Sequence, residues 1–330
     1  MHRNKDMPKL AYRDALKQAL IDAMREDPDI FVIGEEVGRY GGAYGVTKDL
    51  IKEFGAERLI DTPISEPSIV GTAVGAAMAG MRPVAELMYV DFIGMTMDQL
   101  CNQAAKIRYM FGGQIGVPMV LRTQGGTGRS AGAQHSQSLE AYVMHTPGLR
   151  LAMPATVYDA YHLLRQSLTQ PDPVVFIEHK GLYAMSEEVD LDVPPPAWGK
   201  SVVRREGKDL VIVTYSRQLH FVMKAAEDLS KMGIEVTVID LRTLNPLDFD
   251  TIRPEVEKVG KAMVVSEGVM TSGVAAELAA RITEECFDFL EEPVIRVAGE
   301  DIPISVSVEL EKNSVPTPDF VVETAQKILA

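Results

Sequence analysis

Cysteine and basic residues are scarce in this sequence of 330 residues, and long apolar runs are absent. Its two cysteines, Cys101 and Cys286, lie too far apart to build a disulfide framework or a zinc site. Lysine and arginine number 33 against 47 acidic residues, and the net charge of −14 argues against nucleic acid or an anionic membrane as the main partner. The longest apolar run, residues 70–81, has 12 residues, fewer than the ~18 that a membrane helix needs.

The overall composition is that of an ordinary folded protein, with 46% hydrophobic and 24% charged residues. A length of 330 residues indicates two domains or one large domain. The first ten residues, "MHRNKDMPKL", contain no apolar segment of the kind that a secretory signal requires. We therefore expect a cytoplasmic protein with no membrane segment.

Helical and strand patterns alternate along the first half of the chain. In "YRDALKQALIDAMRED" (12–27) the apolar residues recur on one face of a helix, namely Ala15, Leu16, Ala19, Leu20, Ala23 and Met24. The short apolar segments "IFVIG", "RPVAELM", "VPMVLRT", "LRLAMP" and "PVVFIEH" are typical of buried strands. This alternation predicts an α/β fold with a parallel sheet and helices on both of its faces.

The alternation is interrupted by "SEEVDLDVPPPAWGK" (186–200), which is acidic and contains three consecutive prolines. Such a composition favours a linker. Beyond it, "DLVIVTY", "IEVTVIDL" and "KAMVVSE" alternate with helical patterns and indicate a second, smaller α/β unit. We therefore predict two domains, covering residues 1–190 and 191–330.

A glycine cluster, "GGTGRSAG" (125–132), follows the strand-like "VPMVLRT". It fits G-x-G-x-x-A, but a dinucleotide site also needs an acidic residue about 20 positions further on, after a second strand. Glu140 comes too early for that role, so the cluster indicates a flexible loop leading to His135. An isolated histidine is usually structural. The position of this one, where we expect the loop to meet a helix, also suits a proton-transfer residue.

Carboxylates at two other positions allow both a structural and a chemical interpretation. In "DTPISEPSIV" (61–70), Ser65 resembles an N-cap and Glu66 favours the helix dipole, yet Glu66 also stands where a low-dielectric pocket would suit proton transfer. Glu35 and Glu36 in "VIGEEVG" end a strand, where site residues of α/β sheets collect, or they are a solvated strand end. Phe92 in "MYVDF" would by default be a core residue.

Taken together, these stretches resemble one family over nearly the whole chain. The motifs that carry the resemblance occur in family order, namely "VIGEEVG", "GGAYGVTKDL", "DTPISE", "GTAVGAAMAGMRPVAE", "AQHSQS", "PGLRLAMP" and "VTVIDLRTLNPLD". The family is the β subunit of the thiamine-diphosphate-dependent first component of 2-oxo acid dehydrogenase complexes. The resemblance implies an N-terminal pyrimidine-binding domain with a parallel sheet and a transketolase C-terminal-type α/β domain.

The resemblance also implies a role for each candidate side chain. Glu66 matches the glutamate that contacts the aminopyrimidine ring nitrogen of thiamine diphosphate and favours its imino tautomer, which takes the proton from the thiazolium carbon. His135 matches a histidine of the active-site channel that is implicated in acyl transfer to the lipoyl group. Phe92 matches an aromatic residue that packs on the pyrimidine. Glu35 matches an acidic residue beside the cofactor, proposed to belong to a proton path between paired active sites.

Metal binding is implied only in part. Relatives hold the diphosphate through Mg²⁺ with a G-D-G…N motif, but "GDG" occurs nowhere in this sequence. The resemblance therefore implies that an α subunit supplies the Mg²⁺ ligands and that the working form is an α₂β₂ heterotetramer, which passes its acyl product to a lipoyl-bearing acyltransferase. The regions of Met119, Gln170 and Asp172 match a potassium site of some relatives, although the local residues differ.

The substrate class remains open at this stage. "AELMYVDF", "NQAAKIRYMFGG" and "EHKGLY" look most like pyruvate and acetoin dehydrogenase β subunits, and branched-chain 2-oxo acids are an alternative. Another transketolase-like enzyme, such as a sugar-phosphate synthase, is disfavoured by the missing metal motif and the short chain. A non-catalytic assembly subunit is disfavoured by the presence of Glu66 and His135, because a scaffold needs neither.

Overall fold

The computed structural model describes residues 8–330 and divides them into two compact units. The first unit contains residues 8–124, 147–149 and 156–196. The second contains residues 125–146, 150–155 and 197–330. The chain thus enters the second unit early, through the glycine-rich stretch, and returns to the first before residue 196. The division into 1–190 and 191–330 stays a prediction.

The first unit begins with a strand and helix that precede its main sheet. Its strands are β1 (Lys9–Ala11), β2 (Ile30–Gly34), β3 (Leu59–Asp61), β4 (Arg82–Leu87), β5 (Val120–Gly125), β7 (Val174–His179) and β8 (Ser186–Glu188). Its helices are α1 (Tyr12–Glu26), α2 (Leu50–Phe54), α3 (Glu66–Met78), α4 (Ala105–Met110) and α6 (Val157–Leu168). Shorter helical segments are η1 (Val90–Thr96), η2 (Asp98–Ala104, a π-helix) and η3 (Lys180–Leu182).

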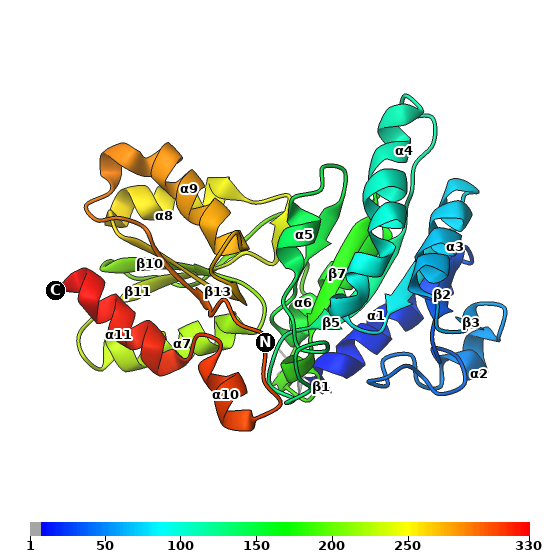
Figure 1. Cartoon of the computed structure of the whole chain (residues 1–330), viewed down its shortest axis with the longest axis horizontal. Helices are drawn as coiled ribbons and strands as arrows, with labels where there is room; N and C mark the ends of the chain where they lie inside the picture. Colours follow the sequence, from blue (N-terminus) through cyan, green and yellow to red (C-terminus); the bar gives the residue numbers. More distant parts are fainter. Residues whose placement is uncertain (1–7) are drawn as a thin grey trace, which may run out of the picture. The chain divides into compact units, whose positions relative to one another are not determined.

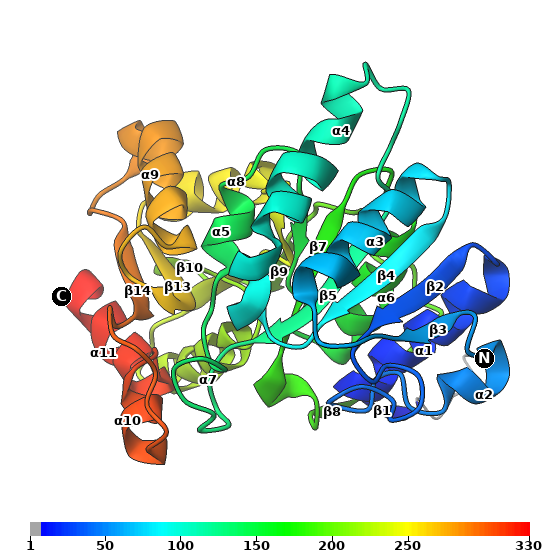
Figure 2. The same cartoon turned by 45° about the vertical axis from the view of Figure 1, so that its right-hand side comes forward.

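The main sheet of the first unit has the strand order β7-β5-β4-β2-β3. Strands β3, β2, β4 and β5 are parallel to their neighbours and run side by side in Figure 2. Every residue of β2, β5 and β7 is buried. Continuous burial is typical of a parallel sheet with both faces covered, as the apolar segments predicted. Strands β1 and β8 form a separate antiparallel pair.

Helix α1 confirms the helical pattern, because it spans Tyr12–Glu26 and ends before Pro28. Its buried residues include every predicted one, namely Ala15, Leu16, Ala19, Leu20, Ala23 and Met24. This face packs against α6, and α3 packs against β4 and β2. Small residues along α3, such as Ala73 and Ala77, bring its backbone close to the sheet that positions its first residue, Glu66.

The second unit contains most of the remaining chain. Its strands are β6 (Arg150–Ala152), β9 (Val202–Arg205), β10 (Leu210–Thr214), β11 (Val236–Asp240), β12 (Thr243–Asn245), β13 (Ala262–Val269) and β14 (Ile295–Gly299). Its helices are α5 (Glu140–Met144), α7 (Gln218–Ser230), α8 (Phe249–Val259), α9 (Val274–Cys286), α10 (Val308–Asn313) and α11 (Pro318–Leu329), together with η4 (Phe287–Phe289).

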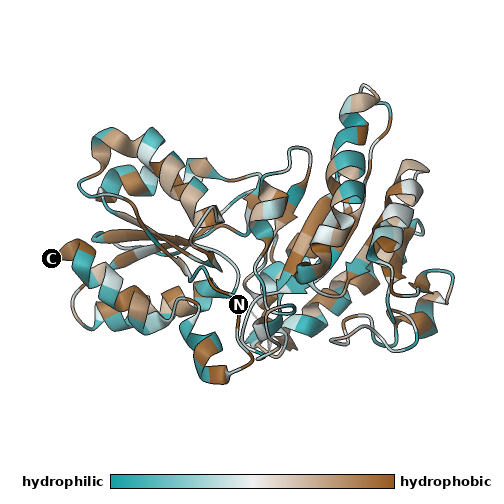
Figure 3. Cartoon of the chain, viewed as in Figure 1, coloured by the Kyte–Doolittle hydropathy of each residue, from teal (hydrophilic) through white to brown (hydrophobic). Residues whose placement is uncertain are grey.

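The second unit is a three-layered α/β structure around a sheet of order β14-β13-β10-β11-β9. Figure 1 shows α8 and α9 on one face of this sheet and α7 with α11 on the other. Residues of β10, β11 and β13 form its core with the inner faces of α7 and α11, including Ile212, Val238 and Val265. Figure 3 shows these strands as strongly hydrophobic and the surrounding helices as mixed, as expected when each helix buries one face.

Several local expectations needed correction. The segment "VPMVLRT" is a strand only from Val120, since β5 starts there and ends at Gly125. The linker candidate begins as β8, which pairs with β1, and only its proline-rich part lies outside regular structure. Two edge strands that were not predicted are antiparallel to their neighbours, β9 to β11 and β12 to β6, within sheets that are otherwise rich in parallel pairs, as predicted. Between residues 8 and 330 no helix has the length and apolar character of a membrane span.

Candidate active site

Three of the predicted site residues gather at one edge of the first unit's sheet. Glu35 directly follows β2, Glu66 follows β3 after a four-residue turn, and Phe92 follows β4. These strands are parallel neighbours, so their carboxyl ends lie together. The backbone N–H of Thr62 donates to the Gly34 carbonyl at 3.0 Å and ties the two turns together. This edge is where open α/β sheets bind ligands.

Glu66 is the first residue of α3 and is only 6% exposed. The preceding Ser65 occupies the N-cap position, but its side chain makes no capping bond and instead donates to the Ser68 hydroxyl at 2.8 Å. In this respect the capping interpretation was wrong. Within residues 8–330, neither a hydrogen bond nor an ion pair engages the Glu66 carboxylate. A nearly buried carboxyl group is therefore available for a ligand.

Glu35 is electrostatically coupled to Glu66. Burial raises the pKa of Glu35 above its usual range, and the carboxylates of Glu66, Glu36 and Glu86 raise it further. Glu36 stands beside it with a positive φ of 53° and is exposed, so the turn directs the two adjacent carboxylates to different surroundings. A carboxyl group with a raised pKa keeps its proton to a higher pH and is suited to hydrogen-bond donation or proton exchange.

Phe92 is half-buried rather than a full core residue, and it closes a chain of aromatic rings. Its ring meets that of Tyr89 edge-to-face at 6.1 Å, and the Tyr89 ring meets that of Tyr44 at 6.4 Å. Tyr44 in turn stacks on Tyr183 at 4.8 Å and donates its hydroxyl hydrogen to Tyr89 at 3.3 Å. The buried ammonium of Lys180 lies 5.5 Å from the Tyr89 ring. Tyr89 thus contacts Phe92 directly, and the remaining contacts fix the position of Tyr89.

A buried ion network beneath this edge was not foreseen. Arg122 on β5 donates to Glu86 on β4 at 2.6 Å and to both carboxylate oxygens of Glu178 on β7, one of them at 2.9 Å. The Tyr183 hydroxyl donates to Glu178 at 2.6 Å. Burial lowers the pKa of Arg122, but the two carboxylates outweigh it and hold that pKa above its usual value. The signal in the sequence was one charged residue inside each of three apolar strands.

His135 belongs to the second unit and lies in a loop, since α5 begins only at Glu140. The expectation that it stands at a helix start was wrong. The glycine-rich loop (residues 125–132) before it turns through positive φ values at Gly126, Gly128 and Gly132, of 85°, 95° and 81°. The backbone N–H of His135 donates to the Gly132 carbonyl at 3.2 Å, and the His135 side chain is half-buried.

Comparison with known proteins identifies the family. The description "Transketolase, pyrimidine binding domain" matches residues 8–186, and "Transketolase, C-terminal domain" matches residues 199–321. The β subunit of the pyruvate dehydrogenase E1 component from Rhizobium meliloti is 42% identical over 98% of this chain and 70% of its own length. This chain belongs to the E1 β-subunit family.

Two further relatives match this chain over nearly their entire length. The pyruvate dehydrogenase E1 β subunit of Porphyra purpurea is 42% identical, and 98% of each chain is covered. The β subunit of acetoin:2,6-dichlorophenolindophenol oxidoreductase from Cupriavidus necator is 40% identical over 97% of this chain and 98% of its own. A solved structure described as a split-gene transketolase, an inactive β4 tetramer, shares the fold with a TM-score of 0.80 at 21% identity, covering 97% and 98% of the two chains.

The potassium site of some E1 β relatives gains no support from the structure. The Asp172 carboxylate pairs with Arg108 at 2.6 Å, and the Gln170 amide donates to the Gln166 carbonyl at 3.0 Å. Met119 is buried, and its carbonyl accepts the Val174 N–H at 2.9 Å. Among the described residues, no group of three or more His, Cys, Asp or Glu side chains is arranged to hold a metal ion.

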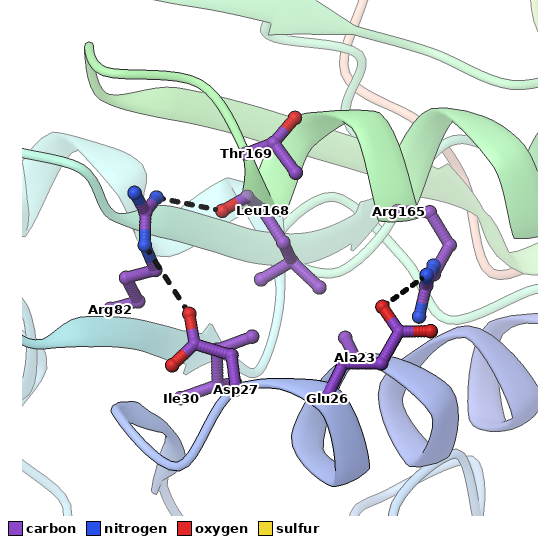
Figure 4. Close-up of a pocket in the computed structure, with 8 residues that line it drawn as sticks. All are labelled: Ala23, Glu26, Asp27, Ile30, Arg82, Arg165, Leu168 and Thr169. Atoms are coloured by element: carbon purple, nitrogen blue, oxygen red, sulfur yellow. Dashed lines mark hydrogen bonds and ion pairs between the residues drawn. The ribbon is translucent and has the colours of Figure 1, made fainter.

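A separate pocket of the first unit lies among α1, β4 and α6, away from the E1 β candidate residues (Figure 4). Its lining residues are Ala23, Glu26, Asp27, Ile30, Arg82, Arg165, Leu168 and Thr169. Arg82 pairs with Asp27 at 3.4 Å, and Arg165 pairs with Glu26 at 2.6 Å. Both arginines of this pocket already have acidic partners, so it does not resemble an anion site. The two ion pairs instead link neighbouring structural elements.

Proposed function

We propose that this chain is the β subunit of a thiamine-diphosphate-dependent first component that cleaves pyruvate or a related 2-oxo acid beside its carbonyl. The single observation that carries the proposal is Glu66, a 6% exposed carboxyl group without a protein partner at the ligand-binding edge of a pyrimidine-domain sheet. Acetoin is a second candidate substrate, favoured by the 40% identity to the β subunit of an acetoin oxidoreductase.

The residues at the sheet edge fit the pyrimidine half of the cofactor. When bound, thiamine diphosphate supplies the carbon nucleophile and the electron sink for the cleavage. Glu66 would hold the proton that it shares with a ring nitrogen, and the low solvent access of its carboxyl group would strengthen that hydrogen bond. Phe92 would orient the ring by packing against it.

Glu35 would serve beside Glu66 as a second carboxyl group that can hold a proton. Burial and the nearby carboxylates of Glu66, Glu36 and Glu86 raise the pKa of Glu35, so Glu35 keeps its proton to a higher pH than an isolated glutamate does. Such a carboxyl group can donate a hydrogen bond and still exchange its proton. The family resemblance implies a further role for Glu35, in a proton path between paired active sites.

The diphosphate half of the site would come from a partner chain. The sequence has no G-D-G motif, and a Mg²⁺ ion that holds a diphosphate needs oxygen ligands of its own. We therefore propose that an α subunit supplies those ligands in an α₂β₂ assembly, and that activity requires it. The two cysteines, Cys101 and Cys286, are not joined in a disulfide, which fits a reducing, cytoplasmic location.

His135 would act after the cleavage, during acyl transfer to a lipoyl-bearing acyltransferase. Its half-buried imidazole follows a loop of unusual backbone geometry, and imidazole exchanges protons near neutral pH. Its proposed task is proton transfer to the leaving sulfur of the lipoyl group as the acyl unit moves. This role is separate from that of Glu66.

The decisive experiment is co-expression of this chain with an α subunit that carries the G-D-G motif. Pyruvate, acetoin and branched-chain 2-oxo acids should be compared as substrates with an artificial electron acceptor. We expect turnover with pyruvate or acetoin to exceed that with branched-chain acids. Activity with none of them, in a complex that binds the cofactor, would favour the non-catalytic assembly role.

Replacing Glu66 by glutamine should remove most of the turnover of this complex. Glutamine keeps the size and a hydrogen-bond donor but cannot exchange the proton, and the loss of one proton-transfer role costs about 10²–10⁴-fold. Glu57→Gln, an exposed control in the same unit, should leave the rate unchanged. A fully active Glu66→Gln complex with cofactor bound would leave Glu66 as a helix-terminal carboxylate only.

Replacing His135 by alanine should lower the lipoyl-dependent rate more than the artificial-acceptor rate, because the imidazole acts in acyl transfer. Both assays use the same reconstituted complex, so cofactor binding cancels from the comparison. Equal losses in the two assays would place His135 in the cleavage step. Unchanged rates in both would make it a structural residue.

The isolated chain should bind thiamine diphosphate weakly, because it offers only the pyrimidine half of the site. Titration of the cofactor and Mg²⁺ by calorimetry measures this directly. Addition of the α subunit should produce tight binding and turnover together. Tight Mg²⁺-dependent binding to the chain alone would contradict the shared site.

A further inference from the structure

Two buried carboxylates of the second unit bind the backbone of the glycine-rich loop. Glu267 on β13 accepts the Thr127 N–H at 2.6 Å and the Thr127 hydroxyl at 2.9 Å. Glu311 on α10 accepts the N–H groups of Gly128 and Ser130, each at 2.9 Å, and the Ser130 hydroxyl at 3.1 Å. Glu311 is only 4% exposed, so its charge is removed from water and is compensated by these loop donors.

The loop needs such bonds, because its own sequence does little to define a conformation. Four of its eight residues are glycine, the residue type that loses most conformational freedom when a chain becomes ordered. Ser130 adopts a φ of 50°, a left-handed conformation that costs free energy for a residue with a side chain. The hydrogen bonds to Glu311 lie on both sides of Arg129 and hold the backbone in this conformation.

His135 is coupled to the loop through short backbone contacts. Its N–H donates to the Gly132 carbonyl at 3.2 Å, and the Gly126 N–H donates to the Gln137 carbonyl at 2.9 Å. Backbone hydrogen bonds therefore join the two ends of the segment 126–137, which carries His135. Any shift of residues 128–130 moves the end of the segment from which the imidazole projects.

We propose that Glu311 is a positioning residue, whose carboxylate fixes the glycine-rich loop and through it the place of His135 during acyl transfer. This inference rests on the role proposed for His135. Glu311 itself need not contact cofactor or substrate. The effect of Glu311 should therefore appear in the acyl-transfer step, in which the imidazole acts. A displacement of a reacting group by about 1 Å can lower a rate up to about 100-fold.

Tryptic cleavage after Arg129 tests the structural half of the proposal in the full chain. Arg129 is exposed, but the N–H of the next residue, Ser130, is bound to Glu311. Cleavage requires the loop to open, so its rate reports the population of the open form. Glu311→Gln removes the charged acceptor and should speed this cleavage about tenfold, as followed by mass spectrometry of the peptide that ends at Arg129.

Two further variants calibrate the cleavage assay. Glu309→Gln makes the same change at an exposed position of α10 and should cleave like the unmodified chain. Ser130→Ala removes only the hydroxyl contact to Glu311 and should speed cleavage about threefold, while both backbone bonds remain. Ser130→Ala also serves as the test if Glu311→Gln does not fold.

The catalytic half is tested in the complex with the α subunit. Glu311→Gln should lower the lipoyl-dependent rate about tenfold and leave the artificial-acceptor rate nearly unchanged, since only the placement of His135 is altered. In a His135→Ala background, Glu311→Gln should cause no further loss of lipoyl-dependent rate. A general loss of stability would instead lower both rates and add to the effect of His135→Ala.

The outcomes separate this inference from the proposed function. Unchanged cleavage in both Glu311→Gln and Ser130→Ala would overturn the anchoring of the loop. Faster cleavage with an unaltered lipoyl-dependent rate, while His135→Ala still lowers that rate, would overturn the positioning role alone. If His135→Ala changes neither rate, the role of His135 fails and the positioning role fails with it, whatever the cleavage shows.

Discussion

The two units place their candidate residues in different ways, although both are α/β structures. In the first unit, Glu35, Glu66 and Phe92 follow the carboxyl ends of three adjacent parallel strands. In the second, His135 follows a glycine-rich loop that carboxylates from β13 and α10 bind. The position of a residue at a strand end is fixed by the hydrogen-bonded sheet. The position of a loop residue depends instead on the contacts that the loop itself makes.

Buried charge also serves the two units differently. In the first unit Arg122 joins three strands through the carboxylates of Glu86 and Glu178, so cation and anions compensate one another. In the second, Glu311 is compensated by two backbone N–H groups and a hydroxyl, whereas Glu267 accepts bonds from Thr127 and pairs with Arg217 only at 4.0 Å. Removal of Arg122 should therefore cost more than loss of one of these loop donors, because two buried carboxylates lose a full opposing charge at once. Three experiments sharpen this comparison, beginning with the largest expected effect.

Arg122→Met should be the most damaging change, because it leaves two buried carboxylates without their cation. We expect a loss of about 3–5 kcal/mol in the free energy of unfolding, measured by chemical denaturation. Arg108→Met removes a surface ion pair with Asp172 in the same unit and should cost at most about 1 kcal/mol. Equal losses from the two variants would contradict the structural role assigned to the network.

Tyr215→Phe tests the second unit and should cost less. The Tyr215 hydroxyl donates to the buried Glu140 carboxylate at 2.8 Å, and burial raises the pKa of Glu140. Without this donor the carboxylate is less well compensated, at a cost of about 1–3 kcal/mol in the free energy of unfolding. Tyr142→Phe, at an exposed ring on α5, is the matched control. A loss larger than that of Arg122→Met would reverse the comparison between the units.

Glu35→Gln should have the smallest effect on stability, with a size that depends on pH. The pKa of Glu35 is raised in the folded state, so its stabilising contribution is complete below the unfolded pKa and is lost as the pH rises through the folded pKa. Glutamine avoids this loss. The variant should therefore melt at a higher temperature than the unmodified chain near neutral pH.

The pH dependence of that difference supplies the check. The gain in melting temperature of Glu35→Gln should shrink toward zero near pH ~4, where an unperturbed glutamate protonates. Glu57→Gln, which is exposed in the same unit, should show no comparable trend. A gain that stays constant across this range would argue that packing, and not the neighbouring carboxylates, causes it.

Local pattern predicted the regular elements well, because burial on a helix or strand follows a short period. Helix α1 has every predicted core residue, and the segment "IFVIG" is β2 without any shift. Element ends were less accurate, as the later start of β5 at Val120 shows. Edge strands such as β9 and β12 were not predicted, since their pairing depends on distant segments.

For the candidate site, too, the sequence predicted individual residues but not the contacts between distant segments. Glu66 and Glu35 could be selected from the sequence, because each follows a strand and carries an unusual charge for its setting. Their electrostatic coupling could not, because it depends on the pairing of β2 with β3. The Arg122 network was visible only as single charged residues inside apolar strands, with nothing to show that three neighbouring strands bring them together.

The sequence by itself determined the α/β class, the E1 β family and the identity of the candidate residues, since these depend on local periodicity and on motifs that lie close together along the chain. Only the tertiary structure decided which charges meet. Glu311 follows Ser130 by 181 positions, yet the two are 2.9 Å apart between the Ser130 nitrogen and the Glu311 oxygen. Such pairings reflect the free-energy cost of burying a charge without a partner, which the assembled fold alone can satisfy.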